Sequence, residues 1–218
     1  MKRAIVVSIA IALFAVLVHA LWQAPPAAVD LRGVVTMNLA ASGVDHPVTA
    51  VLLNYRGYDT LLEVAVLLVA LIAILAAGIT PRDAVPPAGD TLLRALAGLV
   101  VPVMLVVAIY LLWAGAFRPG GAFQAAATLA AAAVLMHLTG RLPAWDPPGP
   151  ALRWGMLAGF LVFLAIAVMS MAEGSLLQYP RGQAGALILL IEAGLTFSLS
   201  LILGGLFLLL SRDRRESR

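Results

Sequence analysis

Long apolar stretches alternate along the chain with short segments rich in proline, glycine and charged residues. A helix needs about 20 mostly apolar residues to cross the hydrocarbon core of a bilayer, since each residue adds about 1.5 Å. The pattern therefore predicts an all-α integral membrane protein with about six transmembrane helices, at residues 4–22, 59–79, 92–113, 122–139, 151–171 and 184–210.

The first apolar stretch follows Lys2 and Arg3, as the apolar part of a secretory signal peptide would. It is longer than the roughly 7–15 apolar residues of such a peptide. No clear Ala-x-Ala cleavage site precedes Pro25 and Pro26 either. We therefore expect the first span to be retained.

The composition supports a membrane protein and excludes several functions. Hydrophobic residues make up 62% and charged residues 11% of the chain, against about 45–50% and about 25% in soluble domains. Six spans leave no room in 218 residues for a catalytic domain outside the membrane. There is no cysteine, so disulfides and thiolate metal sites are excluded. We predict no nucleic-acid partner, because the net charge of +3 fits basic residues beside spans. We also predict no metal and no cofactor, because the sequence contains no cluster of metal ligands and no dinucleotide fingerprint.

The basic residues predict the orientation, because cytoplasmic loops carry an excess of Lys and Arg. If successive loops alternate across the membrane, four arginines lie on one side, at positions 32, 56, 118 and 181. The other 10 of the 14 basic residues lie on the opposite side, at positions 2, 3, 82, 94, 141, 153, 212, 214, 215 and 218. Both termini, including a basic tail at 212–218, are therefore predicted to be cytoplasmic.

The longest loop, residues 23–58, is then outside. Its first half contains Pro25, Pro26, Asp30 and Gly43 and is predicted to be irregular. The second half starts at Pro47 and has apolar residues at helical spacing, which indicates a short helix at the membrane interface. The alternative is a surface loop packed on a neighbouring protein.

Carboxylates inside two predicted spans are candidates for an ion pathway. Glu63 lies about one turn into the second span and Glu192 about two turns into the sixth. A carboxylate in hydrocarbon costs about 3 kcal/mol or more unless it is paired, hydrated or protonated. Asp59 shares a helix face with Glu63 and is a third candidate. The structural alternatives are an N-cap for Asp59 and, for Glu63, an ion pair with a neighbouring subunit.

Glu192 precedes a run of small and hydroxylated residues, Gly194, Thr196, Ser198 and Ser200. Such residues allow close packing and hydrogen bonds between helices, so a structural role for Glu192 is as plausible as an ionic one. His19 and His137 lie near the ends of the first and fourth spans. Either could relay protons, although a structural role is the more common one for a single histidine.

The third and fourth spans are joined by a short segment that contains Pro119, Gly120, Gly121, Phe123 and Gln124. The paired glycines allow a tight turn with positive φ, and Gln124 offers a donor and an acceptor at the start of the next helix. A phosphate-binding loop is excluded because no Gly-Lys-Ser/Thr sequence is present. We find no nucleophile with its base, no cluster of metal ligands and no dinucleotide fingerprint.

Two segments resemble a known family. Residues 48–68, VTAVLLNYRGYDTLLEVAVLL, resemble the two-helix module at the end of the large A subunit of Mrp-type multisubunit cation/proton antiporters. A similar module is a separate small subunit in membrane-bound hydrogenases. Residues 92–210, with FRPGGAFQ at 117–124 and IEAG at 191–194, resemble the B subunit of those antiporters.

The resemblance implies a fusion of a two-helix module at 1–80 with a four-helix B-like domain at 91–211. It also implies a non-catalytic subunit of a multisubunit assembly in the cell inner membrane, with other subunits, lipid, protons and a monovalent cation such as sodium as partners. Asp59, Glu63 and Glu192 then lie near a cation route. The alternatives are the same module in a redox-driven relative, such as a hydrogenase or a complex I-like assembly, and a purely structural scaffold.

The predicted orientation can be tested by cysteine labelling, because the chain has no cysteine of its own. Arg118→Cys should react with an impermeant maleimide outside intact cells, whereas Arg82→Cys should react only after the membrane is opened. Labelling of Arg82→Cys in intact cells would contradict the orientation.

Overall fold

The computed structural model describes residues 2–23, 31–77, 91–142, 148–172, 174, 176–180 and 182–210. Every regular element in these ranges is a helix. The α-helices are α1 (Lys2–Trp22), α2 (Leu31–Asn38), α3 (Pro47–Ala50), α4 (Gly57–Ala76), α5 (Thr91–Ala114), α6 (Ala122–Leu138), α7 (Pro150–Ser170) and α8 (Ala184–Leu210). The chain forms two compact units, Met1–Val34 and Val35–Arg218, which are described separately.

The all-α membrane fold is confirmed. Within the described residues, α1, α4, α5, α7 and α8 are each long and apolar enough to cross a membrane. The remaining predicted span, the fourth at residues 122–139, corresponds to α6, which is apolar but has only 17 residues. At about 1.5 Å per residue, α6 is about 26 Å long and somewhat shorter than a typical bilayer core. The chain is therefore a multi-pass integral membrane protein.

The first unit consists mainly of α1. All the side chains described in this helix are exposed, and none of its apolar window is buried within the chain. An apolar helix with no covered face requires lipid or another protein around it.

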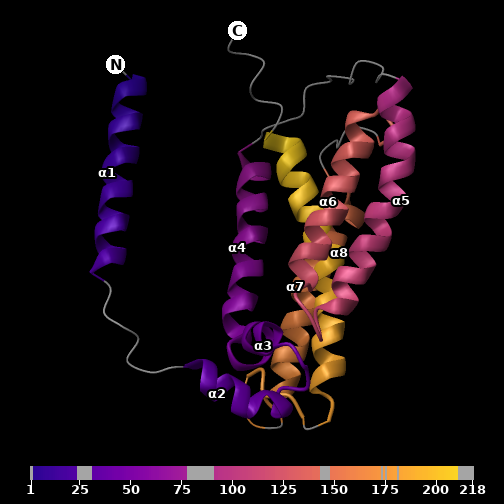
Figure 1. The fold of residues 1–218 in the computed structure, drawn as a ribbon. Coiled ribbons are helices and arrows are strands. Elements are labelled where there is room, and N and C mark those ends of the chain that lie inside the picture. The colour runs from indigo at the N-terminus through magenta and orange to yellow at the C-terminus, as the bar shows by residue number, and fades with distance from the viewer. Residues whose placement is uncertain are drawn as a thin grey trace. The chain divides into compact units, whose positions relative to one another are not determined.

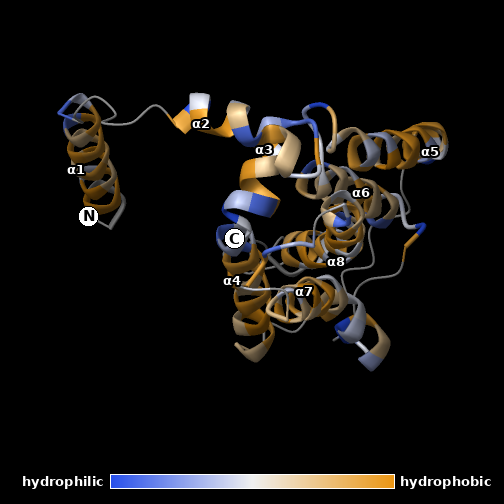
Figure 2. Ribbon diagram, turned by 90° about the horizontal axis from the view of Figure 1, so that it is seen from below, coloured by the Kyte–Doolittle hydropathy of each residue, from blue (hydrophilic) through white to orange (hydrophobic). Residues whose placement is uncertain are grey.

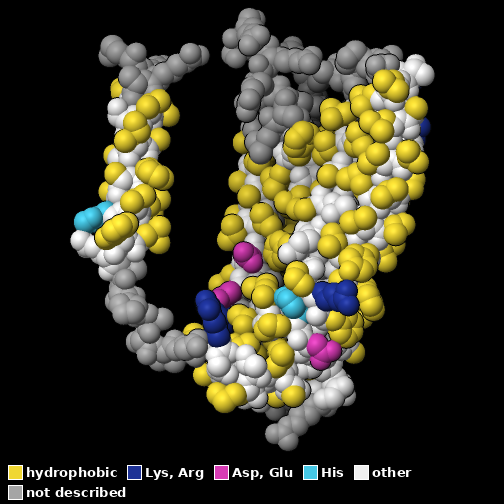
Figure 3. Space-filling model, viewed as in Figure 1, with side chains coloured by type: hydrophobic (Ala, Val, Ile, Leu, Met, Phe, Trp, Pro, Cys, Tyr) yellow, Lys and Arg dark blue, Asp and Glu magenta, His cyan; other side chains and the backbone are white. Residues whose placement is uncertain are grey.

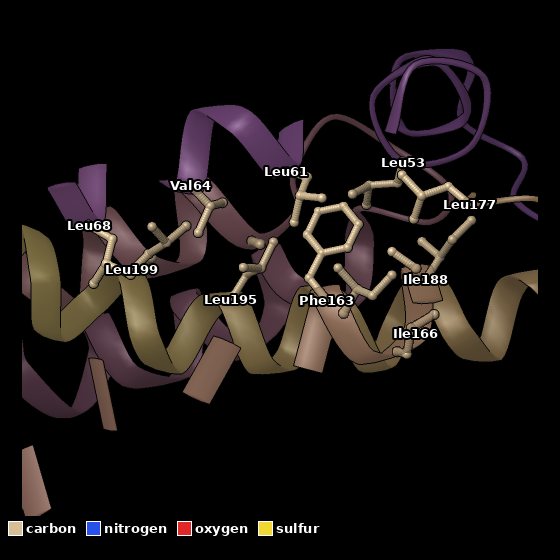
Figure 4. Packing of buried hydrophobic residues seen from close by; sticks show 14 of the residues in the cluster. Leu53, Leu61, Val64, Leu68, Phe163, Ile166, Leu177, Ile188, Leu195 and Leu199 are labelled. Atoms are coloured by element: carbon tan, nitrogen blue, oxygen red, sulfur yellow. The ribbon is translucent and has the colours of Figure 1, made fainter. Parts of the chain in front are cut away.

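The second unit is a bundle around α8. Helices α4, α6 and α7 pack against α8, and α5 packs mainly on α6 (Figure 1; Figure 2). Leucine and isoleucine side chains of α8 form the centre of the core, together with Phe163 of α7 (Figure 4). On α4, Leu61, Val64 and Leu68 face this core at a spacing of three and four residues, which places them on one side of the helix.

Small residues bring α7 and α8 close together, as the sequence predicts. A Cβ atom on Gly159 would lie 2.5 Å from the carbonyl oxygen of Gly194 and 2.7 Å from Cβ of Ser198. The hydroxyl of Ser198 donates a hydrogen bond to the carbonyl oxygen of Met156, at 3.0 Å. These contacts are typical of helix pairs in membranes, where packing replaces the hydrophobic effect.

The prediction that the first half of the 23–58 loop is irregular is wrong at residues 31–41 and confirmed at residues 42–46, which form turns and bends around Gly43. Helix α2 and a 3₁₀ turn, η1 (Leu39–Ala41), occupy residues 31–41. Gly33 and the β-branched residues Val34, Val35 and Thr36 have low helix propensity, which conceals this helix in the sequence. Tertiary contacts support its end, since the Tyr55 hydroxyl donates to the carbonyl oxygen of Asn38 at 2.6 Å.

The predicted helix in the second half is confirmed. Helix α3 continues into a π-helical turn, η2 (Val51–Tyr55). Side chains satisfy two of its carbonyl groups: Thr60 donates to Leu52 at 2.6 Å, and Tyr179 donates to Leu53 at 2.8 Å. Burial raises the pKa of the Tyr179 hydroxyl, so this group remains a donor at neutral pH.

Several predicted features lie outside the described residues. These are the prolines and the aspartate at 25, 26 and 30, the arginines at 82 and 181, and the basic tail at 212–218.

Candidate functional site

The turn between α5 and α6 is built from glycines. The N–H groups of Gly115 and Gly121 both donate to the carbonyl oxygen of Leu111, at 3.2 Å and 2.8 Å. A Cβ atom on Gly120 would lie 2.6 Å from that same oxygen. Gly121 has φ of +105° and ψ of −172°, a conformation that only glycine adopts readily. The predicted tight turn with positive φ is confirmed.

The side chain of Glu192 lies against this turn. Glu192 is only 3% exposed, and its carboxylate accepts a hydrogen bond from the backbone N–H of Ala122, the first residue of α6. A Cβ atom added to Gly121 would lie 2.6 Å from Glu192 Oε1, and one added to Gly115 would lie 3.1 Å from the same oxygen. The two glycines therefore form a cradle, in which a buried carboxylate approaches the positive N-terminal end of a helix.

One oxygen of this carboxylate has no partner. Glu192 Oε2 is fully buried and makes no hydrogen bond with any described residue, so the bond from Ala122 reaches Oε1. Buried polar atoms are nearly always hydrogen-bonded, and leaving one unpaired costs about 1–3 kcal/mol. The free oxygen can instead carry a proton, or it can meet a water molecule or a cation.

The loop before α3 covers the opposite side of the turn. The N–H groups of Asp45 and His46 donate to the carbonyl oxygen of Ala116, at 2.9 Å and 3.0 Å. The buried hydroxyl of Thr49 donates to the carbonyl oxygen of Gly115. Nδ1 of His46, a half-buried residue, lies 3.4 Å from Thr49 Oγ1. The backbone of Gly115 and Ala116 thus separates Glu192 from a histidine and a threonine.

The sequence analysis missed His46 and Thr49. A local signal existed, because His46 precedes a proline at the first position of α3 and Thr49 lies in the first turn. Their carbonyl partners are about 66 residues away in the chain, however, and no local pattern reports such a contact.

The structure does not join Glu63 to Glu192. Asp59 lies in the first turn of α4 and forms an ion pair with Arg56, which occupies the N-cap position. The alternative of Asp59 as an N-cap is therefore wrong, because α4 begins two residues earlier than the sequence suggests. Glu63 is exposed on the outer face of α4, and no described residue pairs with it. It must meet water or another protein.

Comparison with known sequences decides the family. A sequence model described as "Domain related to MnhB subunit of Na+/H+ antiporter" matches residues 92–210, more than half of the chain. The chain belongs to this MnhB-related family. The matched residues include the glycine turn and Glu192. No curated protein sequence matches the chain.

Solved structures share the fold. One is a chain in the "Structure of Mrp complex from Dietzia sp. DQ12-45-1b", with 24% identity and a TM-score of 0.70 over 100% of the present chain. The present chain spans only 27% of that chain. Another belongs to the "membrane-bound sulfane sulfur reductase (MBS), an archaeal respiratory membrane complex", with 22% identity and a TM-score of 0.70. That match covers 94% of the present chain and 97% of the other.

The structure places the two predicted histidines of this MnhB-related protein in different units. His19 is exposed on α1, in the first unit. His137 is 7% exposed in the last turn of α6, and its Nδ1 has no partner among the described residues. Fifteen residues separate His137 from Ala122, which is about 22 Å along a helix. His137 and Glu192 therefore cannot exchange a proton directly.

The remaining motif residues surround the start of α6. Phe123 is half-buried and packs against the hydrophobic core. Gln124 is exposed, and its side-chain oxygen would lie 3.9 Å from a Cβ atom on Gly121. Within the described residues, no group of three or more acidic, histidine or cysteine side chains could hold a metal ion.

The cradle can be tested with Gly121→Ala. We expect a loss of roughly 2 kcal/mol or more in the free energy of unfolding, because the methyl group meets Glu192 and the backbone is strained. Gly140→Ala is the control: Gly140 also has positive φ, at +71°, but no atom lies within 4 Å of its Cβ position. It should cost about 1 kcal/mol.

A double-mutant cycle separates the clash from the strain. In a Glu192→Ala background, Gly121→Ala should lower the free energy of unfolding by about 1 kcal/mol less than it does in the wild type. The decrease caused by Gly140→Ala should be the same in both backgrounds. Unfolding of the purified chain in detergent micelles measures all of these values. An unchanged cost of Gly121→Ala in this background would contradict the contact.

Proposed function

We propose that this chain is a non-catalytic membrane subunit of a Mrp-type monovalent cation (Na+)/proton antiporter complex, with Glu192 on the ion route. The observation that carries the proposal is the buried carboxylate with a free oxygen in a member of the MnhB-related family. A single free oxygen can be neutralised by a proton or by a monovalent cation, but not by both at once. Such competition for one negative charge is what coupled exchange requires.

The cradle suits this role because it holds the carboxylate without neutralising it. The N-terminal end of α6 and the Ala122 N–H lie against one oxygen of the carboxylate, while no described residue neutralises the other. The charge state can therefore respond to the ions that reach Oε2. A full ion pair with Arg or Lys would instead keep the carboxylate permanently charged.

We assign a route to the outer side through the loop before α3. Thr49 and His46 lie directly behind the turn that holds Glu192. A histidine ring and a threonine hydroxyl can each donate and accept a hydrogen bond. Water between these groups and Glu192 would complete the path.

Glu63 supports a site at a subunit interface. Glu63 lies nearly two turns after the start of α4, at about 3.6 residues per turn, and an exposed carboxylate at this place in an apolar helix cannot face lipid without cost. We infer that a neighbouring subunit of the assembly provides a polar path or a base at this face of α4. The pair of Asp59 with Arg56 lies at the entrance to the same helix face.

We further propose that residues 1–80 correspond to the two-helix module at the end of the large antiporter subunit, and residues 91–211 to an MnhB-like four-helix domain. The whole chain is similar to 27% of a longer chain in the Mrp complex. This similarity supports the idea that the two parts together form a unit that also occurs within a larger polypeptide.

The second candidate is the same protein in a redox-driven assembly. The similarity to a chain of almost equal length in the sulfane sulfur reductase complex favours it. Co-purification distinguishes the two, because redox partners would bring nickel or iron–sulfur absorbance. A purely structural scaffold is the third candidate.

Glu192→Gln and Glu63→Gln in the assembled complex test the proposal. We expect Glu192→Gln to lower sodium-driven proton movement in inverted membrane vesicles by about tenfold or more, which corresponds to about 1.4 kcal/mol. Glu63→Gln should lower the rate or shift its pH profile. Glu216→Gln, the same substitution in the C-terminal tail outside the predicted spans, controls for a general effect of the substitution.

The complex must assemble in each variant, as shown by co-purification of its subunits. Unchanged exchange and an unchanged pH profile in both glutamine variants would favour the scaffold and overturn the ion route.

A further inference from the structure

The end of α5 near the glycine turn carries aromatic side chains on its exposed surface. Tyr110, Trp113 and Phe117 are each half or more exposed. Their rings form a row, with centroids 6.4 Å apart for the first pair and 5.5 Å for the second, and the rings are tilted to each other. Aromatic rows of this kind mark the level of the lipid headgroups.

A basic side chain lies at the end of this row. Trp113, Ala114, Phe117 and Arg118 line an open pocket of about 340 Å³. Ala114 is buried and small, which makes room between the two larger rings. Arg118 is exposed, and no described residue forms an ion pair with it. The pocket therefore combines a free positive charge with an apolar wall.

The surface that leads away from the pocket is uniformly bulky. From Leu99 to Trp113, every exposed position of α5 is Leu, Val, Ile, Pro, Tyr or Trp. Hydrophobic side chains cover the visible length of α5 in Figure 3. Helices that pack together in membranes use small residues at their contact, and this face has none. Such a face suits flexible acyl chains better than a second helix.

We propose that this pocket binds an anionic phospholipid, with the phosphate on the Arg118 guanidinium, the headgroup against Trp113 and Phe117, and an acyl chain along α5. The guanidinium suits a phosphate because it offers several donors in one plane. Arg118 lies between Gly115 and Gly121 in the chain, so the bound lipid contacts the turn that holds Glu192.

Quenching of Trp113 by brominated lipid tests the site directly. The full-length chain, with its other tryptophans at 22, 145 and 154 changed to Phe, is reconstituted in phosphatidylcholine vesicles that contain brominated phosphatidylglycerol or brominated phosphatidylcholine. We expect the anionic lipid to bind next to Trp113 about fivefold more tightly than the zwitterionic one. In Arg118→Gln this ratio should fall to about one, and Arg118→Lys should keep part of it.

Arg94→Gln is the matched control. Arg94 is also an exposed arginine of α5, but it lies in the first turn, at the other end of the helix. This variant should keep the full preference at Trp113. The proposal is overturned if the chain with Arg118 binds the anionic and the zwitterionic lipid equally well next to Trp113. It is also overturned if Arg118→Gln keeps the same preference for the anionic lipid as the chain with Arg118. Absence of quenching by either lipid would show that another helix covers the face and also overturns it.

Discussion

The contact between Glu192 and the N-terminal end of α6 is the constraint on which the rest of the site depends. A carboxylate can approach the first N–H of a helix this closely only where the backbone carries no side chains, and Gly121 and Gly115 meet that condition. In a bilayer, a buried carboxylate requires a favourable dipole and a hydrogen bond. The glycine turn provides both without an opposing full charge.

The same turn joins the separate parts of the second unit. Helix α8 approaches it with Glu192. The N–H groups of Asp45 and His46, in the loop before α3, and the hydroxyl of Thr49, in α3, donate hydrogen bonds to its carbonyl groups. Gly43 in that loop is equally tight against α8, since a Cβ atom there would lie 2.6 Å from Cβ of Ala184. Movement at the turn would therefore displace both the loop before α3 and α8. An ion that changes the charge of Glu192 acts at the point where these segments meet.

Much of this fold could be predicted from the sequence, because apolar stretches of membrane length report helices directly. The apolar helices and the positive φ of the Pro-Gly-Gly turn followed from local patterns. Glu192 could be chosen as a candidate because a carboxylate in an apolar stretch is costly. Helix α2 could not be predicted from the sequence, since its Gly33 and β-branched residues favour other conformations and tertiary contacts support its end. The partners of Glu192, and the roles of His46 and Thr49, depend on contacts between residues far apart in the chain.

The density around Glu192 in a high-resolution electron cryo-microscopy map of the assembled complex would show whether this carboxylate lies on an ion route. We expect Oε1 to remain on the Ala122 N–H and an ordered water molecule or cation to lie within hydrogen-bonding distance of Oε2. An Arg or Lys side chain of a neighbouring protein paired with Oε2, or a dry apolar surface around it, would contradict the ion route.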